Sequence, residues 1–207
     1  MGLFGALFGP SKKQVWHQLC DEIGATYVSG GFWRGDKVLI TVSNWTVTLD
    51  TYTESHSAGE HHNSTTYTRM RVPYIAQGGF QFKIYRKGIF SSLGKFFGRQ
   101  QIEIGDPQLD DAFVFQANDE ERLRNLLADD TIRQLIAAQP RMLLEVRDNE
   151  GWLKKKLPAH VDELYFSAVG VIKDVERLKL LCGLFGHLLL KLAEAGSASE
   201  ADPKVVL

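Results

Sequence analysis

The sequence has little cysteine and almost no net charge, and each shortage excludes a class of protein. Its 207 residues hold two cysteines, Cys20 and Cys182, far apart on segments that we expect to be helical. We therefore expect both cysteines to be apolar packing residues of a protein in a reducing compartment, and not parts of a disulfide framework. The formal net charge of -1 gives no global attraction to nucleic acid, so we expect no nucleic-acid partner. Together these features favour a cytoplasmic location.

Long apolar runs and targeting signals are also lacking. The uncharged run 180–190 is shorter than the roughly 20 apolar residues that cross a bilayer. Residues 1–10 form an apolar N-terminal segment, but the sequence shows neither the basic start nor the small-residue cleavage site of a secretory signal. Ala6 stands where a myristoylation signal has Ser or Thr. The sequence predicts neither a membrane span nor export.

An apolar stripe near the C-terminus predicts the central helix of the fold. With 44% hydrophobic residues, the chain is able to bury a sizeable core. Within 171–192, apolar residues recur at alternating spacings of four and three, which places them along one face of a helix. They are Val171, Val175, Leu178, Cys182, Phe185, Leu189 and Leu192. Leu180 and Leu190 spread the apolar surface further, and we expect a sheet to contact Phe185.

Alternation with a period of two predicts antiparallel strands before this helix. The expected strands are 37–42, 45–50, 64–73, 80–85, 101–104, 113–116, 142–147 and an edge strand at 152–157, and the segment 164–168 leads towards the long helix. The polar stretch 54–63 predicts a hairpin loop, and Pro73 a break in the returning strand. Shorter helices are expected at 11–23, 118–127 and 131–138, each preceded or opened by a capping residue: Ser11, Asn118 and Asp130.

The chain has no linker-like stretch, so we expect one domain. That domain is α+β and covers 11–196, with an antiparallel sheet packed against the long C-terminal helix and smaller flanking helices. Residues 197–207 have little apolar surface to bury and predict a mobile tail.

An acidic and aromatic run in the second half resembles a known pattern. It consists of Asp106, Pro107, Asp110, Asp111, Ala112, Phe113, Val114 and Phe115, then residues 119–127. With the short strand and the long helix that follow, it resembles uncharacterised bacterial domain-of-unknown-function proteins over roughly the last half of the chain. The resemblance supplies no catalytic residue. Some members of those families have membrane-spanning helices ahead of the shared region, a feature that this sequence does not show.

Two clusters have the residue types of metal or acid–base sites. His56, His61 and His62, with acidic residues nearby, have metal-ligand chemistry, although a solvated hairpin tip explains them more simply. The acidic cluster is Asp106, Asp110, Asp111 and Asp119. It has ligand types for a divalent cation or for acid–base work, whereas turn and capping roles are the simpler interpretation. No motif indicates a cofactor or a catalytic triad.

Two apolar, glycine-rich segments with basic neighbours predict an interaction surface. The candidate interface residues are Phe4, Phe8, Ile89, Leu93, Phe96, Phe97, Lys95 and Arg99. This combination suits an anionic membrane surface or the apolar groove of a protein partner, and packing on the sheet is the structural alternative.

We therefore expect a cytoplasmic binding or scaffolding module, acting at a membrane surface or in an assembly. A metal-dependent hydrolase that uses the histidine or acidic cluster is the alternative.

Overall fold

Nine antiparallel strands form one sheet in the computed structural model, which describes residues 9–31, 35–58, 61–88, 101–148, 157–205 and 207. The strands are β1 (Thr26–Val28), β2 (Lys37–Val42), β3 (Trp45–Ala58), β4 (His61–Ala76), β5 (Phe82–Arg86), β6 (Phe113–Ala117), β7 (Leu143–Arg147), β8 (Val161–Val169) and β9 (Ala198–Ser199). Their order is β1-β2-β3-β4-β8-β7-β5-β6, and β9 pairs with β4.

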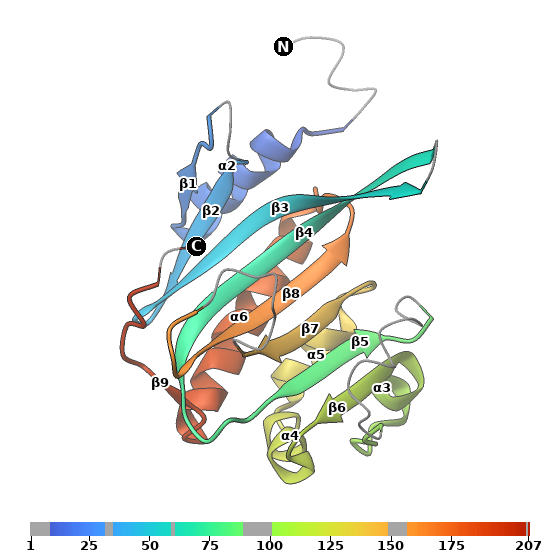
Figure 1. Cartoon of the computed structure of the whole chain (residues 1–207), viewed down its shortest axis with the longest axis vertical. Coiled ribbons are helices and arrows are strands. Elements are labelled where there is room, and N and C mark those ends of the chain that lie inside the picture. The colour runs from blue at the N-terminus through green and yellow to red at the C-terminus, as the bar shows by residue number, and fades with distance from the viewer. Residues whose placement is uncertain (1–8, 32–34, 59–60, 89–100, 149–156, 206) are drawn as a thin grey trace.

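Helices cover one face of this sheet, as Figure 1 shows for α6 behind the strands. The helices are α2 (Lys12–Ile23), α3 (Pro107–Ala112), α4 (Glu120–Leu126), α5 (Asp130–Ala137) and α6 (Val175–Glu194). The α+β class, the antiparallel sheet and the long C-terminal helix that the sequence predicted are confirmed. We call the opposite side of the sheet the outer face.

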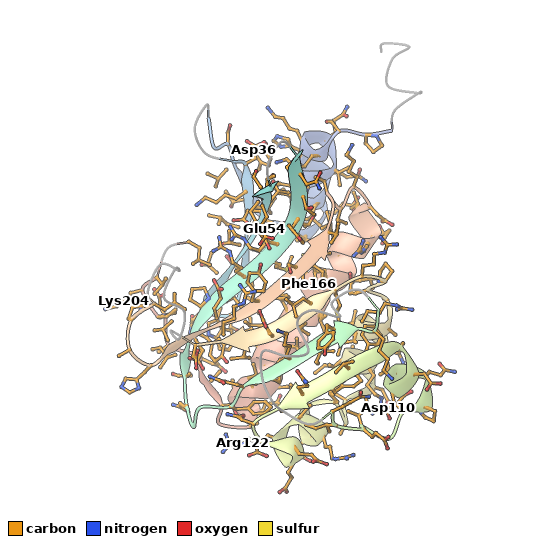
Figure 2. All side chains as sticks on the ribbon, turned by 45° about the vertical axis from the view of Figure 1, so that its right-hand side comes forward. Asp36, Glu54, Asp110, Arg122, Phe166 and Lys204 are labelled. Carbon is orange, nitrogen blue, oxygen red and sulfur yellow. The ribbon has the colours of Figure 1, made fainter. Side chains whose placement is uncertain are left out.

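The core lies between the sheet and α6. Alternate strand residues point toward the helices, so Leu49, Phe166 and Ile84 share one buried cluster with Phe185 of α6. Figure 2 shows Phe166 near the middle of the molecule. Phe185 is completely buried, as its place in the apolar stripe predicted.

Helix α6 begins four residues later than the sequence predicted. The carboxylate of Asp174 accepts a hydrogen bond from the backbone N–H of Arg177 at 3.1 Å and caps the helix there. Before it, Gly170 has φ +88°, which ends strand β8 in a left-handed turn. Leu180 and Leu190 remain 43% and 41% exposed, so the apolar surface does not extend all round the helix.

The loop predicted at 54–63 is wrong, because β3 and β4 continue through it as a hairpin. Ordered cross-strand pairs run from Thr51 opposite Thr68 to Ala58 opposite His61. The hydroxyl groups of Thr53 and Thr66 lie 3.0 Å apart across this ribbon. Threonine favours extended backbone through its β-branched side chain, and a polar sequence therefore forms strands without an apolar face.

The break predicted at Pro73 is also wrong. Pro73 lies within β4 and pairs with Glu163 of β8, beyond the end of the pairing with β3 at Thr48 and Arg71. Proline is tolerated in a strand where its missing N–H would face no ladder partner.

Aspartate caps shape the helices between β5 and β7. The carboxylate of Asp106 accepts from the backbone of Gln108 and Leu109 and, with Pro107 in the first turn, starts a short helix, α3, that the sequence analysis missed. Helices α4 and α5 are capped by Asp119 and Asp129. The caps predicted at Asn118 and Asp130 are each displaced by one residue, as neighbouring Asn and Asp residues are equally good caps.

The segment predicted as a tail begins on the sheet. Ser199 pairs with Ile75 and Ala198 with Ala76, forming β9. Near the end of the chain, the backbone oxygen of Leu207 accepts a hydrogen bond from the Lys37 ammonium at 2.7 Å. The predicted edge strand at 152–157 lies, apart from Leu157, outside the described residues.

Candidate binding site on the outer face

The strand register brings polar, charged and aromatic side chains from six strands into one row on the outer face. Neighbours in this row are paired in order: Thr48, Arg71, Tyr165, Glu145, Lys83 and Gln116. An antiparallel sheet commonly leaves its second face in water. Here, however, Lys83, Glu145 and Tyr165 are only 5%, 6% and 3% exposed. The outer face therefore holds charges at positions largely removed from solvent.

Asp50 is the centre of the first group of ion pairs. Its carboxylate accepts two hydrogen bonds from the Arg69 guanidinium, both at 2.7 Å, in a fork-to-fork arrangement. The same carboxylate accepts a hydrogen bond from Arg71 at 2.8 Å. Arg71 also lies 3.8 Å from the carboxylate of Glu163. Two arginines of β4 are thus held in fixed orientations by carboxylates on both neighbouring strands.

Glu145 is the centre of the second group. Its carboxylate lies 3.3 Å from the Lys83 ammonium and also accepts a hydrogen bond from Arg147. The guanidinium of Arg147 lies 3.1 Å from the centroid of the Tyr165 ring, in cation–π geometry. This contact joins the second group to Tyr165 in the middle of the row.

Stacked tyrosines form the more accessible end of the network. Tyr52 and Tyr67, directly opposite each other on β3 and β4, stack with ring centroids 5.0 Å apart. Arg69 lies 4.9 Å from the Tyr52 centroid, and the Tyr165 hydroxyl donates to that of Tyr52 at 3.4 Å. Burial, more than neighbouring charge, raises the pKa of Tyr52 and Tyr67, so both phenols stay neutral donors.

The network pairs four cations with four carboxylates. Its cations are Arg69, Arg71, Arg147 and Lys83, and its carboxylates are Asp50, Glu145, Glu163 and Glu54, which lies beside Tyr67. The Nε of Arg71 is buried and has no hydrogen-bond partner among the described residues. The planar guanidinium groups of this network have the donor geometry that suits carboxylate or phosphate oxygens.

A separate buried carboxylate, Asp162, lies on the helix-covered face. It pairs in register with Tyr74 of β4 and is 8% exposed. Burial, followed by repulsion from Asp148, raises the pKa of Asp162 to about 6. Within the described part of the chain, its carboxylate has no cationic partner or hydrogen-bond donor.

The histidines predicted as metal ligands occupy the projecting end of the β3–β4 hairpin. His56 pairs with Asn63, Ser57 with His62 and Ala58 with His61.

The acidic cluster is used in local backbone contacts. Asp106 and Asp119 cap α3 and α4, as described above. The carboxylate of Asp110 accepts from the backbone N–H groups of Ile104 and Gly105 at 2.9 and 3.0 Å. Asp111 is exposed. Among the described residues, no group of three His, Cys, Asp or Glu side chains is positioned to hold a metal ion.

The candidate interface residues lie outside the described residues. These are Phe4, Phe8, Ile89, Leu93, Phe96, Phe97, Lys95 and Arg99. Within the described part of the chain, none of the helices is both long enough and apolar enough to span a membrane.

Comparisons with known proteins found no matching family model, no matching curated protein and no matching solved structure. A role for the residues of the outer face is therefore inferred from their geometry. The sequence analysis missed them, although one signal was present: Asp50, Arg69, Arg71, Glu145 and Arg147 all stand at alternate positions of strands, opposite in phase to the apolar residues.

Proposed function

We propose that this protein is a cytoplasmic binding module that recognises an acidic segment of a protein partner on its outer face. The observation that carries the proposal is that the guanidinium groups of Arg69, Arg71 and Arg147 are held beside the tyrosines of β3, β4 and β8, with the Nε of Arg71 lacking a partner among the described residues.

The buried ion pairs of the outer face are costly for the fold. Taking charges out of water costs several kcal/mol per ion, and buried ion pairs are weak contributors to stability compared with apolar residues of similar volume. A fold that keeps Lys83 and Glu145 about 5% and 6% exposed therefore gains little stability from them. We infer that Lys83 and Glu145 are present because they orient neighbouring side chains for recognition.

Tyrosine and arginine are enriched at the residues that dominate protein–protein binding energy, since both combine a large flat surface with hydrogen-bond donors. Here Asp50 holds the Arg69 guanidinium by two hydrogen bonds, and the Tyr165 ring supports that of Arg147. Preorganised donors lose less conformational entropy when a ligand binds.

Access is greatest toward the tyrosine end. The side chains of Arg69 and Arg147 are 24% and 22% exposed, against 6% for Lys83. Tyr52 and Tyr67 are half-buried beside Arg69. We therefore assign first contact with the acidic segment to Tyr52, Tyr67 and Arg69.

A fluorescence anisotropy titration tests this function. The probes are a labelled eight-residue peptide rich in Asp and Glu, and a peptide of the same length in which Asn and Gln replace them. We expect the acidic peptide to bind, the neutral one not to bind, and affinity to fall as salt rises from 50 to 300 mM.

The matched variants are Arg69→Gln on the outer face and Arg124→Gln on α4, which remove the same charge from the two sides of the molecule. Arg124 is 44% exposed and pairs with Glu120. Arg69→Gln should weaken peptide binding about tenfold, in line with loss of a charge-assisted contact, while Arg124→Gln should leave it unchanged. Equal loss in both variants would mean that net charge, and not this site, attracts the peptide.

A further inference from the structure

The fold leaves the buried carboxylate of Asp162 without compensation. Asp162 stands near the start of β8, opposite the buried Tyr74 of β4, and only 8% of it is exposed. In the part of the chain that the structure describes, no side chain supplies this carboxylate with a cation or a hydrogen-bond donor. Buried charges in proteins are ordinarily paired or bound to a metal ion. The position therefore calls for a positive group from outside the chain.

A second carboxylate, that of Asp148, lies beside Asp162. Arg147 pairs with Glu163 in the ladder between β7 and β8, and Asp148 and Asp162 are the next residues on those two strands. Burial, and then repulsion from Asp148, raises the pKa of Asp162 to about 6. Two like charges therefore meet at the end of the sheet where β8 begins, at the lower left of Figure 1.

The Asp148 carboxylate is oriented from the side of β5. Gln81, just before β5, donates from its side-chain amide to one oxygen of Asp148. Gln81 is itself fixed, because its backbone N–H donates to the Asn118 side chain at 2.9 Å and its carbonyl accepts from the Asn118 backbone at 3.0 Å. Hydrogen bonds of this kind orient the carboxylates that bind metal ions. Asp148 is thus an oriented oxygen ligand beside an uncompensated one.

We propose that Asp148 and Asp162 together bind one hard divalent cation, of the class that contains Mg²⁺, Mn²⁺ and Ca²⁺. Carboxylate and water oxygens suit these ions, whereas zinc and copper favour imidazole and thiolate ligands. Mg²⁺ commonly keeps several waters and takes only one or two carboxylates from a protein. Water therefore supplies the remaining ligands.

The cation offsets the repulsion between the two carboxylates and stabilises the folded chain by mass action. Asp162 lies on the helix-covered face of the sheet, whereas the arginines and tyrosines that bind an acidic segment lie on the outer face. Cation binding is therefore a separate property from partner recognition, and each is able to fail without the other.

Titration of the EDTA-treated full chain with Mn²⁺ at pH 8 tests the proposal, with free Mn²⁺ measured by electron paramagnetic resonance. We expect one bound Mn²⁺ per chain, displaced by excess Mg²⁺ or Ca²⁺. The matched variants are Asp162→Asn and Asp111→Asn, which remove the same charge from the pair and from an exposed position. Asp162→Asn should weaken Mn²⁺ binding at least about tenfold, and Asp148→Asn likewise, because even the neighbours of metal ligands contribute that much. Asp111→Asn should leave the affinity unchanged.

Thermal unfolding at pH 8 gives an independent readout. In EDTA, Asp162→Asn should unfold at a higher temperature than the unsubstituted chain, because the repulsion is gone. About 5 mM MgCl₂ should raise the unfolding temperature of the unsubstituted chain but not that of Asp162→Asn, relative to NaCl of equal ionic strength.

Two results overturn the proposal. One is free Mn²⁺ that equals the total Mn²⁺ with about 100 µM of each at pH 8, a concentration range in which carboxylate sites of proteins bind divalent ions. The other is Mn²⁺ binding that Asp162→Asn weakens no more than Asp111→Asn, since the ion would then be held by other carboxylates.

Discussion

Replacement of Asp162 by asparagine should stabilise this protein at alkaline pH. The carboxylate is 8% exposed, has no cationic partner among the described residues and is repelled by Asp148. Its pKa is raised to about 6 in the folded state. In the unfolded chain, an aspartate has an ordinary pKa of about 3.9.

The sign and size of the effect follow from this difference. Below pH 4 the group is protonated in both states and contributes nothing. As the pH rises from 4 to 6, the unfolded chain releases the proton more readily, so ionisation progressively disfavours the folded state. Above pH 6 the penalty is complete, and two pKa units correspond to about 3 kcal/mol. Asparagine has nearly the same shape and carries no charge, so it avoids this penalty.

The assay is urea denaturation at pH 4.5 and pH 8, with Asp111→Asn as the control because Asp111 is exposed. We expect Asp162→Asn to raise the free energy of unfolding by about 2–3 kcal/mol at pH 8 and by much less at pH 4.5. In thermal unfolding, each kcal/mol corresponds to about 2–4 °C for a chain of this size. An equal gain at both pH values, or a loss at pH 8, would refute the reasoning.

Three further substitutions test the core, a helix cap and the outer-face network. Phe185→Ala should lower the free energy of unfolding by about 3–5 kcal/mol, because the side chain is fully buried. Leu190→Ala, at a 41% exposed site, should lower it by less than about 1 kcal/mol. The urea midpoints of the two variants distinguish these outcomes. Asp174→Ala removes the cap of α6 and should lower the free energy of unfolding by about 1 kcal/mol. An unchanged urea midpoint would contradict the capping role. Glu145→Gln removes the carboxylate that Lys83 and Arg147 share and should cost about 1–3 kcal/mol in the same assay; an unchanged midpoint would contradict a structural role for this carboxylate.

Local patterns predicted the elements whose cause is local. The apolar spacing of α6 and the Ser11 cap of α2 each lie within a few turns of one helix, and both were read correctly from the sequence. The alternation of β2 and the first part of β3 likewise predicted their hairpin, with its turn at Ser43. Only the exact ends were displaced, because adjacent residues compete to cap a helix.

The projecting hairpin was not predictable from hydrophobic alternation. Its strands carry Thr and Ser on both faces, so no apolar period marks them. Their stability comes from cross-strand pairs such as Thr53 with Thr66, and these depend on the register between two strands.

The outer-face site was hidden for a related reason. Its row joins Arg71, Tyr165, Glu145 and Lys83, which are far apart in sequence. These residues become neighbours only because β8 and β7 separate β4 from β5 in the sheet. Strand order is set by packing of the whole chain, and a strand read alone does not reveal it.

Chemical-shift mapping shows whether the outer face binds an acidic segment. Backbone amide signals of the isotopically labelled protein are followed while the acidic peptide is added. We expect the largest shifts at Tyr52, Tyr67, Arg69 and Arg147, with little change along the exposed side of α6 around Leu190. Shifts concentrated on the helices, with the outer-face signals unmoved at saturation, would contradict it.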